Sequence, residues 1–185
     1  SILIMTPVIT RIYDPTVYEE WVIWFSLSMV CMPLVTLGYE SAIILENRIN
    51  SSSVCKLCAM IGVIITSIIV SIFLYVGIFE KDNKFWCLSF GVFIYTSVLN
   101  NIFYNWVSTF ENYKLYAALQ ALTPIMTSLF HILFGIYTDS SKNLVMGTVL
   151  GQVFTTIIII IVINKINALK IKKSIQIKRL YILGK

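Results

Sequence analysis

The sequence predicts an all-α protein, a polytopic membrane helix bundle with five full transmembrane helices plus the end of another. Two observations predict this fold class. Of the 185 residues, 58% are apolar and only 12% are charged, whereas soluble domains carry about 25% charged residues. The charged residues also stand between long uncharged runs, and about 20 consecutive apolar residues form a helix long enough to cross the hydrocarbon core of a bilayer.

The uncharged runs define the five full helices in chain order. They contain 19, 23, 26, 24 and 22 residues and occupy Trp21–Tyr39, Leu57–Phe79, Phe85–Phe110, Leu115–Thr138 and Asn143–Asn164. Backbone polar groups in hydrocarbon need partners within their own segment, which favours helices over open strands. Residues 1–10 are too short to span and have no basic leader. We interpret them as the last half of a helix whose start is missing, so the chain is expected to be a fragment of a longer membrane protein.

The stretch TPVITRIYDPTVYEEW, residues 6–21, separates the first two predicted helices. Asp14 is a residue type that caps helices, and Pro15 suits a first helical position because its missing N–H needs no partner there. Thr16-x-x-Glu19 is an alternative capping-box pattern. Either pattern predicts a tight turn followed at once by a helix.

Two features within the predicted helices concern their shape and packing. Pro33 and Pro124 each remove one backbone hydrogen bond, which predicts kinks that serve either as fixed shape or as hinges. Gly147-x-x-x-Gly151 predicts a face on which the last helix packs closely against a neighbour.

The basic residues predict the orientation of the chain. Ten of the 14 lie in the alternate loops 40–56 and 111–114 and in the tail after Asn164, against four in the opposite loops. Basic residues mark the cytoplasmic side, so the tail is expected inside and the 11–20 loop outside. Segment 165–185 is predicted to be a basic cytoplasmic interfacial helix, or alternatively a linker. This charge pattern favours membrane lipids as a partner, and we expect no nucleic acid to bind.

Polar residues form stripes on three successive predicted helices. They are Ser97, Asn101, Asn105 and Ser108; Gln120, Thr123, Thr127 and His131; and Thr148, Gln152 and Thr156. Spacings of three and four place each set on one helix face. One interpretation is hydrogen bonding between helices, which contributes about 0.6 kcal/mol per pair on average. The other is the wall of a hydrated cavity, which amides on successive helices favour.

The sequence carries no pattern typical of an enzyme or a metal site. Cys55-x-x-Cys58 has no second pair and no histidine nearby, so we interpret both residues as small apolar side chains. His131 is the one histidine of the chain. Glu19 and Glu20 are adjacent and point to different faces, and no nucleophile or phosphate-loop motif occurs. We therefore expect no catalytic residue, metal or cofactor.

Several short motifs resemble one transporter family. TPVITRIYDPTVYEEW, followed by TLGYESAIIL, resembles the start of bacterial polysaccharide-biosynthesis flippases, of the O-antigen or teichoic-acid type. They belong to the multidrug, oligosaccharidyl-lipid and polysaccharide exporter superfamily. The residues that carry the resemblance are Pro7, Arg11, Tyr13, Pro15, Tyr39, Glu40, Ala42 and Ile43. Glu19 and Glu20 depart from the family's aromatic-glycine pair. Further on, NWVSTFENYKLYAALQAL resembles the cytoplasmic link into a helix, and LVMGTVLGQVF resembles the entry to the next.

The resemblance implies a function and a location. Residues 1–185 would be the N-terminal transmembrane lobe of a two-lobe flippase in the bacterial cytoplasmic (inner) membrane. It would turn over undecaprenyl-diphosphate-linked oligosaccharide for surface polysaccharide such as lipopolysaccharide O-antigen. The expected partners are this lipid-linked oligosaccharide, membrane lipids and glycan polymerase machinery. Amides bind sugar hydroxyls and cations bind diphosphate, so the substrate-binding residues we predict are Arg11, Lys114, Asn101, Asn105, Gln120 and Gln152.

Two other function classes remain open from the sequence. A drug or cation exporter of the same superfamily would carry a cation-binding carboxylate deep inside a helix, whereas all nine acidic residues here lie at helix ends or in loops. A membrane glycosyltransferase or glycan polymerase would carry a large outer loop or a cluster of catalytic carboxylates, and these 185 residues show neither.

Overall fold

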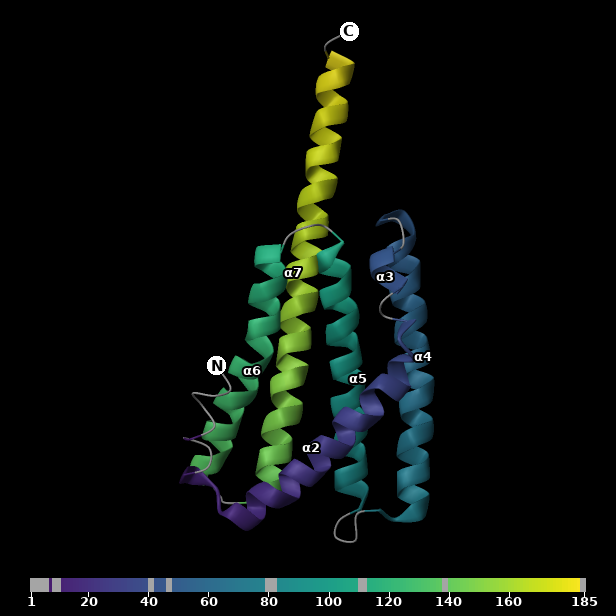
Figure 1. Cartoon of the computed structure of the whole chain (residues 1–185). Helices are drawn as coiled ribbons and strands as arrows, with labels where there is room; N and C mark the ends of the chain where they lie inside the picture. The colour runs from purple at the N-terminus through teal and green to yellow at the C-terminus, as the bar shows by residue number, and fades with distance from the viewer. Residues whose placement is uncertain are drawn as a thin grey trace.

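The described part of the chain is helical. The computed structural model describes residues 7, 11–39, 42–45, 48–78, 83–109, 113–137 and 140–183. Its main helices, labelled as in Figure 1, are α2 (Pro15–Thr36), α3 (Ala42–Leu45), α4 (Arg48–Val76), α5 (Asn83–Ser108), α6 (Tyr113–Tyr137) and α7 (Ser141–Leu183). The predicted all-α class is therefore confirmed for the residues that the structure describes.

Four helices within the described residues are long and apolar enough to cross a membrane. The segments concerned are Ser53–Val76, Lys84–Ser108, Tyr113–Ile136 and Ser141–Lys165. Together they make the chain a helical membrane protein. Each corresponds to one predicted run, from the second run to the fifth.

The predicted full span Trp21–Tyr39 is not confirmed as a fifth crossing. Helix α2 begins at Pro15 and ends at Thr36, so Glu19 and Glu20 lie inside it and only 16 residues follow them. Sixteen helical residues cover about 24 Å, less than the roughly 30 Å of a hydrocarbon core. The half-helix predicted at residues 1–10 lies outside the described residues except for Pro7.

The four long helices stand side by side and alternate in direction, as Figure 1 shows. The end of α4, the start of α5, the end of α6 and the starts of α7 and α2 lie at one end of the bundle. The end of α5 and the start of α6 lie at the opposite end, as does α3. Helix α2 crosses the others obliquely and contacts α4, α5 and α7.

Local chemistry sets both ends of α2. Asp14 is the N-cap, and its side chain accepts a hydrogen bond from the Thr16 backbone N at 3.2 Å. Pro15 follows as the first helical residue, so the Asp-Pro signal and not the capping box starts this helix. At the other end Leu37 adopts a left-handed conformation with φ 48°, and its N–H donates to the Pro33 carbonyl at 3.0 Å. Gly38 continues with φ 74° and turns the chain away.

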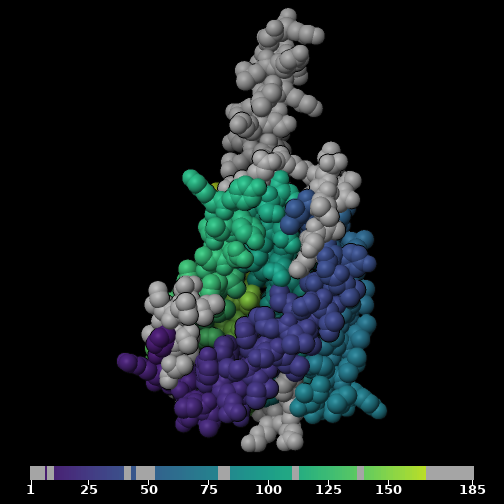
Figure 2. Space-filling model, in the orientation of Figure 1, coloured from purple at the N-terminus to yellow at the C-terminus, as the bar shows by residue number. Residues whose placement is uncertain are grey.

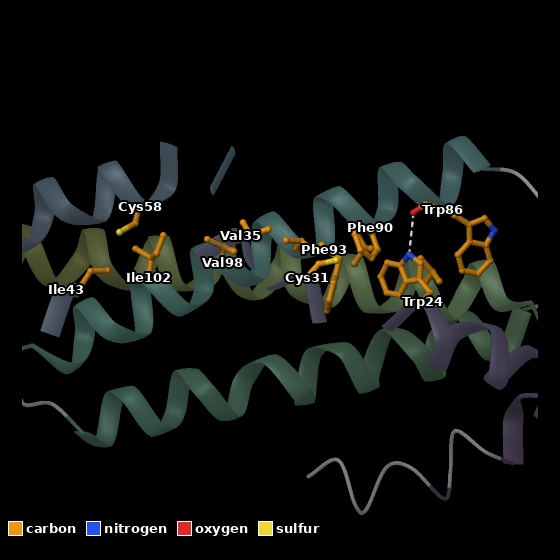
Figure 3. Close-up of a cluster of buried hydrophobic side chains, with 13 residues drawn as sticks. Trp24, Cys31, Val35, Ile43, Cys58, Trp86, Phe90, Phe93, Val98 and Ile102 are labelled. Carbon is orange, nitrogen blue, oxygen red and sulfur yellow. Dashed lines mark hydrogen bonds between the residues drawn. The ribbon is translucent and has the colours of Figure 1, made fainter. Parts of the chain in front are cut away.

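One hydrophobic cluster holds α2 against α5. Trp24, Cys31 and Val35 lie on one face of α2 and are buried in one cluster with α5. Figure 3 shows Trp24 and Cys31 near Phe90 and Phe93, and Val35 beside Val98. The Trp24 indole also donates to the Trp86 carbonyl, at 3.4 Å. Because one face of α2 packs against α5, the neighbouring face, which carries Trp21 and Phe25, is left to line a cleft.

Helices α6 and α7 pack at backbone distance, as the glycine pair predicted. A Cβ built on Gly151 would stand 2.6 Å from Thr127 Cα, and one on Gly147 would stand 3.3 Å from His131 Cα. No side chain fits between these helices there. In a membrane the hydrophobic effect does not drive helices together, so close van der Waals packing of this kind holds the pair.

The outer faces of the bundle are apolar. Met60, Ile64, Ile68 and Ile72 follow one another at intervals of four along α4, and all are exposed. Helix α6 exposes a similar row, which includes Leu129. Such faces suit contact with lipid tails.

Helix α7 continues as a single helix to Leu183, beyond the end of the bundle (Figure 1). Segment 165–185, predicted to be a basic interfacial helix, is helical up to that residue. Its contact with a membrane surface stays a prediction.

Candidate binding cleft

A cleft of about 440 Å³ lies where α2 diverges from α6. Figure 2 shows it as a hollow between the surfaces of α2 and α6, with α7 visible at its floor. Its volume falls in the range of small-molecule sites, about 300–1,000 Å³. It is lined by Tyr18, Trp21, Phe25, Met29 and Met32 of α2; Ser97, Asn100, Asn101 and Tyr104 of α5; Gln120, Thr123, Pro124, Thr127, Ser128 and His131 of α6; and Thr148 and Gln152 of α7.

Most of the predicted polar stripes meet in this cleft. From α5 come Ser97 and Asn101, and from α7 come Thr148 and Gln152. The whole α6 stripe lines the cleft: Gln120, Thr123, Thr127 and His131. Three stripe members, Asn105, Ser108 and Thr156, are not among the lining residues. The structure thus places most of the stripe residues on one cleft, and that the cleft is hydrated stays a prediction.

Helix α2 supplies a wall of aromatic rings, which the sequence analysis did not predict. Tyr18, Trp21 and Phe25 succeed one another along α2 with ring centroids 5.3 and 5.2 Å apart. The signal was present in the sequence as aromatic residues at helical spacing, but the same pattern is typical of a hydrophobic core. Only the oblique path of α2 decides that these rings face the amides of α5 and α7.

Three helices are joined by hydrogen bonds at one end of the cleft. The Trp21 indole N–H donates to Thr148 Oγ1 at 2.8 Å, and His131 Nε2 lies 2.9 Å from the same oxygen. The Thr148 hydroxyl donates to the Leu144 carbonyl at 2.8 Å. Since its one hydrogen is used there, His131 Nε2 must be the donor. The Tyr13 hydroxyl donates to the His131 carbonyl at 2.8 Å, which connects the segment before α2 to the same group of helices.

A second network lies further along the cleft. Asn100 Nδ2 donates to Gln152 Oε1 at 2.7 Å, and Thr156 Oγ1 lies 3.0 Å from Asn100 Oδ1. Tyr104 Oη and Thr123 Oγ1 are 2.6 Å apart and join α5 to α6. The interpretation of the stripes as hydrogen bonding between helices is confirmed for Thr123, His131, Thr148, Gln152 and Thr156. All of these except Thr156 also line the cleft.

Some cleft residues keep unused hydrogen-bonding capacity. Ser97 Oγ is buried and finds no partner among the described residues. Asn101 and Gln120 line the cleft without a side-chain hydrogen bond to any described residue. Pro124 has no N–H, so the Gln120 carbonyl also lacks its usual helical donor. The Ser97 hydroxyl has no accessible surface in the empty cleft, whereas Asn101 is half-buried and Gln120 exposed, so these two amides are the groups that a ligand or water can reach.

The predicted substrate-binding residues divide into two groups. The structure places Asn101, Gln120 and Gln152 on the cleft. Arg11, Lys114 and Asn105 are not among its lining residues, and both cations are exposed. Arg11 stands two residues before Tyr13, whose hydroxyl touches His131 at the end of the cleft. That any of these residues binds substrate stays a prediction.

The cysteines and the histidine form no metal site within the described residues. No group of three or more potential ligands comes together there. The four cysteines remain thiols, and Cys58 Sγ lies 3.7 Å from the Tyr39 carbonyl oxygen. The Cys-x-x-Cys pair thus sits on α4 as part of helix packing.

Asn100 is the cleft residue that the stripe pattern missed most directly. It is buried, with 2% of its surface exposed, and it links α5 to α7. In the sequence Asn100 precedes Asn101, and the spacing of four from Ser97 assigns only Asn101 to the polar stripe. Only the packing of Asn100 against Gln152 shows that both asparagines belong to the cleft.

Comparison of this chain with protein-family models, with curated proteins and with solved structures finds no match.

Proposed function

We propose that this chain is part of a transporter that flips undecaprenyl-diphosphate-linked oligosaccharide across the bacterial cytoplasmic membrane for surface polysaccharide synthesis. The observation that carries the proposal is the cleft between α2 and α6, which places amide and hydroxyl side chains of three spanning helices opposite an aromatic wall. Hydroxyls of a sugar match the amides, and sugar ring faces match aromatic rings. The motif resemblance to polysaccharide flippases points the same way.

The lining of the cleft favours this proposal over a cation exporter. Its described lining residues include twelve with hydroxyl, amide or imidazole side chains but no aspartate or glutamate. A bound cation at membrane depth would need a carboxylate or a cage of oxygens to replace its water. An uncharged glycan needs only hydrogen bonds and apolar contact, which this cleft offers.

A fifth crossing of the membrane is part of the proposal. Helix α2 would form it together with α3, which packs beside α4 and α5 at the opposite end of the bundle. Ile43 of α3 is fully buried in the same cluster as Trp24 of α2. In this arrangement Glu19 and Glu20 would lie at headgroup depth, outside the hydrocarbon. One lobe of the flippase would then comprise residues 1–185, with the second lobe on a further part of the protein.

Arg11 would hold the diphosphate at the outer end of the cleft. It is exposed and is tied to that end through Tyr13. A guanidinium grips phosphate oxygens with two parallel hydrogen bonds, which an ammonium cannot do. Lys114, at the opposite end of the bundle, would be the weaker inner contact. If Arg11 grips the diphosphate, Arg11→Ala abolishes surface glycan at matched membrane levels and Arg11→Lys restores only part. Normal glycan in Arg11→Ala would show that the residue only anchors the chain.

The direct test of the function is reconstitution of the full-length protein into liposomes that contain a fluorescent undecaprenyl-diphosphate-linked glycan. Flipping is measured as the fraction of fluorophore that a membrane-impermeant quencher reaches. Native protein is expected to raise this rate, and Asn101→Trp, which fills the cleft, is expected to lower it at least tenfold. Ile64→Trp on the outer face of α4 is the matched control and should flip as the native protein does. Equal rates with and without protein would contradict the proposal.

A further inference from the structure

Three unused hydrogen-bonding groups gather at the middle of the membrane-spanning helices. Ser97 and Asn101 lie near the midpoint of the α5 span Lys84–Ser108, and Gln152 near that of the α7 span Ser141–Lys165. Ser97 is only 4% exposed, and its hydroxyl has no partner among the described residues. An unmade hydrogen bond costs most at this depth, where water is scarce.

The neighbouring network fixes what these groups offer. Asn100 donates to Gln152 Oε1 at 2.7 Å, which leaves Gln152 Nε2 with its hydrogens for a ligand. Asn101, the next residue on α5, lines the cleft with its whole amide, so it offers both an acceptor and donors. Ser97 lies one turn earlier and adds a hydroxyl. The three residues together can donate and accept, and none is charged.

Apolar side chains of α2 face the same part of the cleft. Phe25 lies with its ring centroid 5.8 Å from that of Phe93, one helical turn before Ser97. Met29, one turn further along α2, also lines the cleft. A ligand group that fills this place therefore needs an acceptor, a donor and a small apolar part, and it carries no charge.

We propose that Ser97, Asn101 and Gln152 form a subsite for an acetamido group. The proposal rests on the glycan-flipping function and names the sugar that the cleft prefers, a 2-acetamido sugar. The acetamido carbonyl accepts from Gln152 Nε2 and from the Ser97 hydroxyl, which turns from its buried position toward the ligand. The acetamido N–H donates to Asn101 Oδ1, and the methyl group packs against Phe25 and Met29. A plain hydroxyl carries its donor and its acceptor on one oxygen atom and not on two separate atoms, so it forgoes the hydrogen bond to Asn101 and leaves the apolar contact empty. A diphosphate would bring charge to a part of the cleft where the described lining residues include no lysine or arginine to match it.

The test compares two glycolipid probes that differ only at this group. They are undecyl 2-acetamido-2-deoxy-β-glucopyranoside and undecyl β-glucopyranoside, both tritium-labelled. Their binding to purified full-length protein is measured by scintillation proximity. We expect the native protein to bind the acetamido probe about 3- to 10-fold more tightly, the gain that one neutral hydrogen bond gives.

Variants assign this preference to the subsite. Asn101→Ala should bring the ratio of the two affinities close to one without harming the fold, because Asn101 bonds no described residue. Ser97→Ala should lower the ratio and also raise the unfolding midpoint of the empty protein, because it removes an unpartnered hydroxyl. Ser108→Ala is the matched control, since Ser108 is on the same helix but off the cleft, and it should keep the native ratio.

The outcomes separate this inference from the proposed function. Equal binding of both probes by the native protein overturns the acetamido subsite, and so does a native ratio in Asn101→Ala. If the protein still flips lipid-linked glycans in liposomes in either case, the function stands and only the sugar preference falls. A preference that disappears in Asn101→Ala and persists in Ser108→Ala supports the subsite.

Discussion

Thr148 joins three helices through one hydroxyl. It accepts from Trp21 of α2 and from His131 of α6, and it donates to its own helix at Leu144. His131 is 5% exposed, so its ring has little access to solvent. An N–H that loses its acceptor at such a buried place costs about 1–3 kcal/mol. The stability of this end of the cleft therefore depends on one oxygen atom.

Thr148→Val removes that oxygen and keeps the size of the side chain. It leaves both the Trp21 and the His131 N–H groups without an acceptor, so we expect a loss of about 2–4 kcal/mol in the free energy of unfolding. The measurement is unfolding in mixed detergent micelles with increasing dodecyl sulfate. Thr155→Val is the control, because Thr155 is equally buried but bonds only the Gly151 carbonyl of its own helix. Equal losses in the two variants would show that the link between helices contributes nothing.

For single residues, the sequence predicted well which side chains share a polar helix face and predicted poorly which residues they bond. Helical spacing identified Gln152 and His131 as members of polar faces. It could not predict that Trp21 would reach Thr148, 127 positions away. Spacing carries information within a helix, whereas contacts between helices depend on how each helix is tilted.

Among the elements, the α6–α7 pair is the most closely packed, because glycine replaces side chains at the contact. Gly151→Ala would place a methyl group 2.6 Å from Thr127 Cα and 2.8 Å from its N. Backbone atoms cannot move aside as the end of a side chain can. We therefore expect the two helices to move apart, which lowers the free energy of unfolding by about 1–3 kcal/mol. Ala121→Val on the exposed face of α6 enlarges a side chain without such a contact and should be neutral within 0.5 kcal/mol or so. The same micelle unfolding assay measures both, and a neutral Gly151→Ala would contradict the close approach.

Helix α2 shows where prediction from the sequence reached its limit. Asp14 and Pro15 predicted its start correctly, because capping is a local interaction. Its predicted span is not confirmed, since the uncharged run continues to Tyr39 while the helix ends at Thr36. Its oblique path is set by the burial of Trp24 against α5, a contact that no local pattern encodes. The aromatic wall of the cleft follows from that path and was missed with it.

For the whole molecule, the alternating directions of the four long helices put the start of α6, at Tyr113, and the start of α7, one residue after Ser140, at opposite ends of the bundle (Figure 1). The excess of basic residues predicts that the Tyr113 end is cytoplasmic. In intact cells a membrane-impermeant maleimide should therefore label Ser140→Cys and not Tyr113→Cys. The background must first lose the native cysteines Cys31, Cys55, Cys58 and Cys87. Labelling of Tyr113→Cys alone would reverse the orientation.

The central claim is that the cleft between α2 and α6 admits water and polar ligands at membrane depth. It rests on polar side chains of α5, α6 and α7 that face one hollow, while the opposite faces of the bundle are apolar. Asn101 and Ile64 offer a matched comparison. Both lie near the middle of spanning segments, Asn101 on the cleft and Ile64 exposed on the outer face of α4.

The most direct measurement is the reaction of a charged methanethiosulfonate with a single cysteine at each position, in the cysteine-free background and in native membranes. The cysteine thiolate attacks the sulfur of the reagent and methanesulfinate leaves, and thiolates form in water and not in hydrocarbon. The account predicts that Asn101→Cys reacts at least tenfold faster than Ile64→Cys, and that a glycolipid occupying the cleft slows the reaction. If Asn101→Cys is as unreactive as Ile64→Cys in folded protein, the cleft is closed to water and the account is contradicted.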